Sequence, residues 1–174
     1  MKEHLLKTWL LLCLFIVGKS NLWADVVSGT TYNTLATSSL PTGWTGSGSG
    51  TSYIQLTSSS SYIQTSSFSQ AGFTTIKIKA RKYNGPSNDQ ALITVSWYDA
   101  STGDETVLGT VAPSNTALTD YTIKSPTNPT GSTTGYIKIQ CKGASSNKGS
   151  GVSQVTITYT TPTTPPFSHL PQVR

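Results

Sequence analysis

The chain has 174 residues, of which 11% are charged, against about 25% in an average soluble protein; its formal net charge is +5. Serine and threonine are abundant, yet β-branched and aromatic residues recur at regular spacing, which disordered chains lack. The composition favours a folded all-β protein, and this net charge is too low to indicate nucleic-acid binding by itself.

The first 24 residues predict a secretory signal peptide. Lys2 and Lys7 precede nine apolar residues, Trp9–Val17, and the segment ends at a cleavage site after Ala24. This apolar run is far shorter than the ~20 residues of a membrane-spanning helix, so we expect no transmembrane segment in the mature chain. Removal of three lysines and one glutamate lowers the net charge to +3, which makes no strong case for nucleic acid as a partner. The expected location is the periplasm, the cell surface or the medium.

Two cysteines are present, and they have different expected roles. Cys13 lies in the signal segment, where acylation as in a lipoprotein is less favoured than simple export because the bulky Leu12 precedes it. Cys141 is then the one cysteine of the mature domain, so no internal disulfide is expected. It shares the parity of Ile137 and Ile139, which predicts a small core residue.

The mature chain divides into one domain and a tail. Residues 25–160 are long enough for a single domain that buries ~70% of its unfolded surface. Thr160–Pro166 has the composition of an extended linker, and Phe167–Arg174 is too short to fold. We therefore assign 161–174 to a linker and an unstructured tail, and expect this chain to be the front part of a longer multidomain protein.

Short alternating segments begin near the N-terminus of the mature chain. Val26 and Val27 in Asp25–Tyr32 indicate a first edge strand. Ser52–Leu56 and Tyr62–Thr65 then flank four serines, a pattern that predicts a β-hairpin.

The clearest alternation is in Thr74–Lys82. Apolar residues at 76, 78 and 80 alternate with Lys77, Lys79 and Arg81, which predicts a strand with one buried and one cationic face.

Ala91–Tyr98 predicts a strand at the centre of a sheet. Ala91, Ile93, Val95 and Trp97 share one side of the pleat, so Trp97 is expected in the core. The turn Asp99–Glu105 closes a hairpin into Thr106–Val111.

Three further segments alternate, and they are Leu118–Lys124, Tyr136–Lys142 and Val152–Tyr159. No segment shows helical periodicity beyond a turn or two. Eight or nine short strands with turn residues between them predict a two-sheet antiparallel β-sandwich or a barrel.

The order of these segments resembles a known module. Leu40–Trp44, Tyr62–Thr65 with Phe68, TTIKIKAR, TVSWYDASTGDETVLGT and GVSQVTIT together look like a bacterial secreted jelly-roll module over Trp44–Tyr159. Such modules lie near the N-termini of exported proteins, beside nuclease-, glycosidase- or adhesin-like domains, and resemble carbohydrate-binding modules in fold. The resemblance implies a jelly-roll β-sandwich. Many relatives carry an acidic residue where this chain has Ser153 and Gln154, which argues against carrying over a structural metal site.

Groups for catalysis are sparse. The one mature histidine is His169, in the tail, so no serine- or cysteine-based triad has a base, and we expect no enzyme activity and no cofactor. Oxygens of Asp99, Ser101, Asp104 and Glu105 could bind Ca²⁺, but an ordinary hairpin turn is the favoured interpretation, so no metal is assigned.

Aromatic and cationic residues supply the candidate ligand contacts, which are Tyr83, Tyr98, Tyr136, Lys77 and Lys79. Tyrosine rings on a sheet bind sugars well, whereas Trp44 is better explained as a cap on one end of the sandwich. Lys77, Lys79 and Arg81 would join Lys138 and Lys142 in a basic patch if their strands are neighbours, and such a patch could suit an anionic polysaccharide or nucleic acid. Protection of exposed sheet edges is the favoured interpretation of both rows.

The predicted function is a secreted, monomeric, non-catalytic accessory module that binds a polysaccharide or cell-surface glycan, or attaches to a surface. A purely structural spacer is the first alternative. The second is the front fragment of an exported hydrolase or nuclease whose catalytic domain follows.

Overall fold

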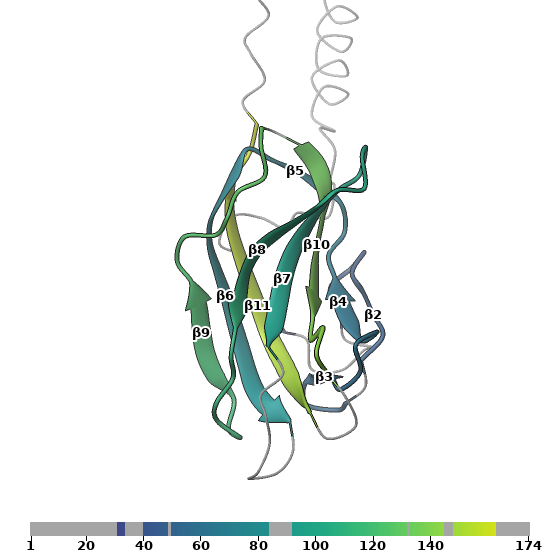
Figure 1. Ribbon diagram of the computed structural model, residues 1–174, viewed down its shortest axis with the longest axis vertical. Helices are drawn as coiled ribbons and strands as arrows, with labels where there is room; N and C mark the ends of the chain where they lie inside the picture. Colours follow the sequence, from purple (N-terminus) through teal and green to yellow (C-terminus); the bar gives the residue numbers. More distant parts are fainter. Residues whose placement is uncertain are drawn as a thin grey trace, which may run out of the picture.

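The computed structural model describes residues 31–33, for which only the backbone is considered, and 40–48, 50–83, 92–131, 133–144 and 148–162. The predicted signal peptide, and residues 163–174 of the predicted tail, lie outside these ranges. Within them the chain forms eleven β-strands and no helix, so no described helix could span a membrane. The strands form two sheets packed face to face (Figure 1).

Each sheet is antiparallel throughout. Sheet A contains β1 (Thr31–Asn33), β3 (Ile54–Leu56), β6 (Gly72–Tyr83), β9 (Thr119–Ile123) and β11 (Gly149–Thr160). Sheet B contains β2 (Thr45–Gly46), β4 (Tyr62–Gln64), β5 (Phe68–Gln70), β7 (Ile93–Asp99), β8 (Glu105–Val111) and β10 (Thr133–Gln140).

The connections give a jelly roll. Sheet A has the order β3-β11-β6-β9, with β1 following β3 along the same side of β11, and sheet B has the order β2-β4-β10-β7-β8. From β5 onward every connection except the β7–β8 hairpin passes from one sheet to the other, which is the topology of a double Greek key. The predicted two-sheet antiparallel jelly-roll sandwich is confirmed.

The core lies between the sheets and follows the predicted alternation. On β6, Ile76, Ile78 and Ala80 are fully buried, while Lys77 on the other face is exposed. On β7, Trp97 is 1% exposed and contacts the rings of Phe68 and Phe73. Burial of each such side chain contributes about 1.5–3 kcal/mol, so the apolar residues at every second position of the strands are the main source of stability.

The hairpin predicted for Ser52–Leu56 and Tyr62–Thr65 is wrong. β3 pairs with β11 in sheet A, whereas β4 pairs with β10 in sheet B, so the serines between them connect the two sheets. A hydrogen bond from Ser61 N to Ser58 O closes the turn. Alternation placed the apolar side chains correctly, because Ile54 and Ile63 are both buried, but it carries no information about the pairing partner.

One edge of β10 is covered by two short strands instead of one long strand. β4 pairs with residues 138–140 and β5 with residues 133–135. Between them Thr65 donates its N–H to Ile137 O, and its hydroxyl accepts the Ile137 N–H, both at 3.0 Å. Thr65 thus satisfies the buried backbone of β10 where the ladder is interrupted.

Candidate functional site

Tyr98 and Tyr136 form the centre of an aromatic surface on sheet B. They lie directly opposite each other on β7 and β10, on the outer side of the pleat, because their neighbours Trp97 and Ile137 point into the core. Their ring centroids are 5.4 Å apart and the ring planes differ by 11°, so the rings stack. Offset stacking is the favoured arrangement of two aromatic rings, and it leaves a partly exposed apolar surface here.

Lys138 links this pair to a third ring. It follows Tyr136 on the outer face of β10, and its Nζ lies 4.8 Å from the ring centroid of Tyr62 and 5.8 Å from that of Tyr98. Tyr62 faces outward on β4, because Ile63 beside it is buried. We call Tyr62, Tyr98, Tyr136 and Lys138 the tyrosine face.

A hollow of about 420 Å³ continues the tyrosine face at one end. It is lined by Asp99, Ala100, Ser101, Thr133 and Thr134. Ala100 and Thr134 follow Tyr98 and precede Tyr136 by two residues, so they form the next row along the sheet, and the Ala100 N–H donates to Thr134 O. The Thr134 hydroxyl also shares a hydrogen bond of 2.7 Å with that of Ser69. Hydroxyl groups thus gather beside the stacked rings.

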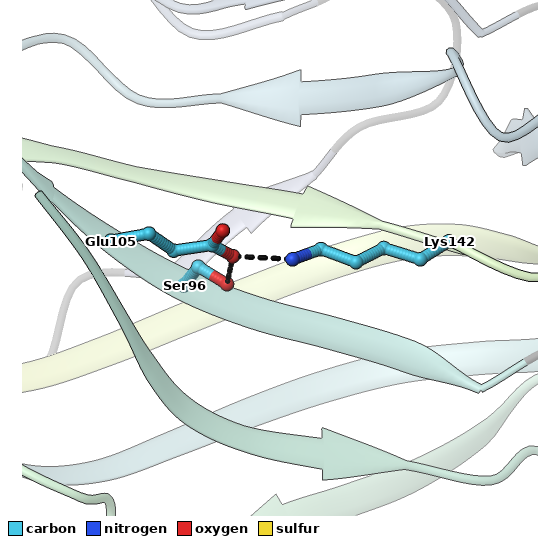
Figure 2. Close-up of polar contacts among 3 residues, drawn as sticks. All are labelled: Ser96, Glu105 and Lys142. Carbon is cyan, nitrogen blue, oxygen red and sulfur yellow. Dashed lines mark hydrogen bonds and ion pairs between the residues drawn. The ribbon is translucent and has the colours of Figure 1, made fainter. Parts of the chain in front are cut away.

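Glu105 lies at the side of the tyrosine face, on β8, directly opposite Tyr98. Its Oε1 accepts hydrogen bonds from Lys142 Nζ at 2.5 Å and from Ser96 Oγ at 2.6 Å. Figure 2 shows the two contacts. The bonds to Lys142 and then Ser96 lower the pKa of Glu105 below its ordinary value. The pKa of the Tyr98 hydroxyl is raised, chiefly by burial and to a smaller extent by the charge of Glu105. At neutral pH this side of the face is therefore a fixed carboxylate beside a neutral phenol.

The turn considered for calcium is held by its own hydrogen bonds. Oδ1 of Asp99 accepts hydrogen bonds from Ser101 N at 2.7 Å, Ser101 Oγ at 2.5 Å and Thr102 N at 3.2 Å. The bonds from Ser101 lower the pKa of the Asp99 carboxyl. Within the described ranges no cluster of three or more His, Cys, Asp or Glu side chains could hold a metal ion. The hydrogen bonds that Asp99 accepts are those of an Asx turn.

The remaining predicted contacts lie away from the tyrosine face. Tyr83 ends β6 in sheet A, opposite Gly149, and Lys77 and Lys79 project from the outer face of the same strand. The predicted set is therefore split between the outer faces of two different sheets. Trp44 is 7% exposed and belongs to the core, which agrees with a cap and leaves little ring surface for a ligand.

The interpretation of the cationic rows needs correction. The strand that carries Lys77, Lys79 and Arg81 lies between β11 and β9, and β10, which carries Lys138, lies between β4 and β7. Neither row is on a sheet edge, so edge protection is wrong as their explanation. The two rows belong to different sheets, so they form no common basic patch.

The sequence left Tyr62 out of the candidate ligand contacts, considered Glu105 only as an oxygen donor to Ca²⁺, and placed Lys138 only in a cationic row. Tyr62 has the outward parity that singled out Tyr136, which is the signal that could have found it. The association of Glu105 with Lys142 depends on the register of β7 with β8 and on the turn after β10, and no local pattern encodes either.

Comparisons with known proteins give neither a family nor a curated relative, because no family model and no curated protein matches the chain. Among solved structures, the chain is similar to a family 36 carbohydrate-binding module in complex with calcium and xylotriose (14% identity, 74% of this chain and 99% of that chain, TM-score 0.47). It is also similar to a family 29 module in complex with cellulohexaose (14%, 77% and 94%, 0.46) and to a family 6 module (13%, 76% and 88%, 0.40). The function is therefore argued from this chain's own side chains.

Proposed function

We propose that this protein is a non-catalytic module that binds a polysaccharide or cell-surface glycan along the tyrosine face. The observation that carries the proposal is the stacked pair of Tyr98 and Tyr136, with Lys138 and Tyr62 on one side and a hydroxyl-lined hollow on the other. Pyranose rings have apolar C–H faces and polar rims, and such a surface can contact both.

The dimensions of the surface support a chain-like ligand. Thr134 and Lys138 lie four residues apart on β10, which corresponds to about 13 Å along a strand. The hollow has the volume of a small binding site, and its position in line with the rings extends the surface in one direction. A short stretch of polysaccharide can therefore contact the hollow, the stacked rings and the Lys138 ammonium together.

The carboxylates of this face support binding without hydrolysis. A glycosidase of the usual kind needs one carboxylic acid whose pKa is raised, so that it can protonate the leaving oxygen. Here the hydrogen bonds to Lys142 and Ser101 hold the pKa values of Glu105 and Asp99 below their ordinary values. Release of reducing ends from any bound polysaccharide by the purified protein would contradict this part of the proposal.

Affinity electrophoresis in gels containing soluble polysaccharides, followed by calorimetry with the matching oligosaccharides, tests the binding. We expect a Tyr98→Ala/Tyr136→Ala variant to bind at least about tenfold more weakly, because the stacking surface is removed. Tyr83→Ala is the matched control, since it removes a tyrosine of sheet A and should leave the affinity unchanged. Wild-type affinity in a folded Tyr98→Ala/Tyr136→Ala variant would overturn the assignment of this face.

A structural spacer is the second candidate function, and one observation favours it. Stacked aromatic pairs on opposite strands stabilise a sheet by themselves. Among the described residues Lys138 forms no ion pair with a carboxylate, and its ammonium group lies over the ring of Tyr98 instead. If stability is their whole role, Tyr98→Ala should lower the free energy of unfolding while no polysaccharide is retained by the wild-type protein.

We further propose that the module acts outside the cytoplasm as a monomer. The signal-like segment 1–24 supports export. N-terminal sequencing of the protein from the culture medium should begin at Asp25, and retention of residues 1–24 would contradict export by this route.

A further inference from the structure

A second hollow lies on the opposite outer surface of the sandwich, in the middle of sheet A. Its volume is about 300 Å³, and it is lined by Lys77, Lys79, Asp120, Thr122, Gln154 and Thr156. These residues come from three neighbouring strands in matching rows: Lys77 lies between Thr122 and Thr156, and Lys79 lies between Asp120 and Gln154. We call this hollow the cationic groove. It is independent of the tyrosine face, because the two belong to different sheets.

The lysines of the cationic groove are not explained by the needs of the fold. Their strand is in the interior of the sheet, where protection of an edge is not required. Among the described residues one ion pair is found, between Lys142 and Glu105. Neither Lys77 nor Lys79 therefore forms an ion pair with a described residue, although Asp120 lines the same groove. Two ammonium groups and several hydroxyl and amide groups thus face one hollow.

The cationic row continues beyond the groove to an aromatic ring. Arg81 follows Lys79 on the outer face, and its guanidinium carbon lies 5.1 Å from the ring centroid of Tyr53. The ring lies over Gly151, the partner of Arg81 on β11; a Cβ at Gly151 would come within 2.3 Å of the ring. From Lys77 to Arg81 the row covers about 13 Å along the strand.

We propose that the cationic groove binds an anionic polysaccharide, with its carboxylate or sulfate groups on Lys77 and Lys79. Thr122, Thr156 and Gln154 supply hydrogen bonds to sugar hydroxyl groups, and Arg81 with Tyr53 extends the contact along the chain of the ligand. The inference does not rest on the tyrosine face, and either site can exist without the other.

The composition of the groove favours a sugar polymer over nucleic acid. Nucleic acids carry a phosphate on every nucleotide, and proteins that bind them neutralise several phosphates at once. The groove has two lysines, and Asp120 on β9, opposite Lys79, repels a closely spaced row of phosphates. Single strands also stack successive bases on aromatic platforms, whereas no ring lines the groove itself and the nearby Tyr53 ring is already in contact with the Arg81 guanidinium.

The test measures binding of the purified protein to polygalacturonate, to dextran sulfate and to single-stranded DNA at low salt. Lys77→Gln/Lys79→Gln should bind the anionic polysaccharide between about threefold and thirtyfold more weakly, and the wild-type affinity should fall as salt rises. Preference for polygalacturonate would identify carboxylate as the recognised group, and preference for dextran sulfate would identify sulfate; both support the groove. Equal or tighter binding of DNA overturns it.

Two controls separate the groove from net charge and from folding. Lys82→Gln/Lys124→Gln removes the same charge from residues that do not line the groove, and should retain at least half of the wild-type affinity. Asp120→Asn removes a repulsive carboxylate and should strengthen binding, a gain that damage to the fold cannot produce. Equal losses in both double variants, or no gain in Asp120→Asn, would reject the proposal. Tyr98→Ala/Tyr136→Ala should leave this binding unchanged, so the two sites fail or succeed separately.

Discussion

The indole nitrogen of Trp97 donates a hydrogen bond to the hydroxyl oxygen of Thr133, over 3.1 Å. The same oxygen accepts Nε2 of Gln70 at 3.2 Å, and Gln70 is fully buried. Oε1 of Gln70, by contrast, accepts no hydrogen bond from the described residues. A single hydroxyl on β10 therefore accepts hydrogen bonds from the N–H groups of two buried side chains.

Replacement of that hydroxyl should destabilise the fold. We expect Thr133→Val to lower the free energy of unfolding by about 1–3 kcal/mol, because two buried N–H groups lose their acceptor. Gln70→Met removes the unpartnered oxygen together with one donor, so it should change stability by less than about 1 kcal/mol. Urea denaturation of both variants measures this, and a larger loss in Gln70→Met than in Thr133→Val would contradict the network.

Gly135 should not tolerate any side chain. A Cβ there would lie 2.0 Å from the carbonyl oxygen of Tyr98 and 2.8 Å from Cζ2 of Trp97. We expect Gly135→Ala to cost at least about 2 kcal/mol of stability, since backbone and core must both shift. Gly143→Ala is the matched control, because no atom lies within 4 Å of its Cβ position. Similar melting temperatures for the two variants would show that β7 and β10 are not so closely apposed.

Acid should weaken the protein partly through Glu105. Its pKa is lowered in the folded state, chiefly by the hydrogen bond from Lys142, so its contribution is present above the unfolded pKa near 4.5 and is lost as the pH falls through the folded value. The pair is partly exposed, so the effect should stay below about 1 kcal/mol. Unfolding measured from pH 6 to pH 3 should have a shallower pH dependence in Glu105→Gln. An unchanged dependence would show that the ion pair contributes nothing in solution.

Cys141 should be unreactive while the protein is folded. Its side chain is fully buried, as its parity predicted, and burial raises the pKa of the thiol to about 11. Because the thiolate is the reactive form, thiol reagents at pH 8 should modify the native protein only as fast as it opens, and modify it at once in denaturant. Rapid labelling under native conditions would place this cysteine at the surface.

The sequence predicted which side chains are buried better than which strands are neighbours. Alternation in Thr74–Lys82 and around Trp97 identified the core correctly, because a two-residue period follows directly from the pleat. The partners of β3 and β4 were wrong, since pairing depends on contacts distant in sequence. The bulge at Ser153, where the register of β11 against β6 shifts, also had no local signal.

The candidate site was predicted in the same partial way. Tyr98 and Tyr136 were both among the expected ligand contacts, but only the register places one ring against the other. Tyr83 has a similar local pattern and lies on a different sheet. Lys77 and Lys79 were interpreted as edge residues because a single sequence does not reveal that their strand has neighbours on both sides.

The position of β11 has a consequence for biosynthesis. Of the described strands this one is the last to leave the ribosome, yet it is the one against which β1, β3 and most of β6 form their hydrogen bonds. Until residue 160 is available, the earlier strands of sheet A lack their central partner, so this half of the sandwich closes only after synthesis of the domain is finished. A nascent chain that stalls before Gly149 would expose the apolar faces of those strands and become a target for chaperones and proteases.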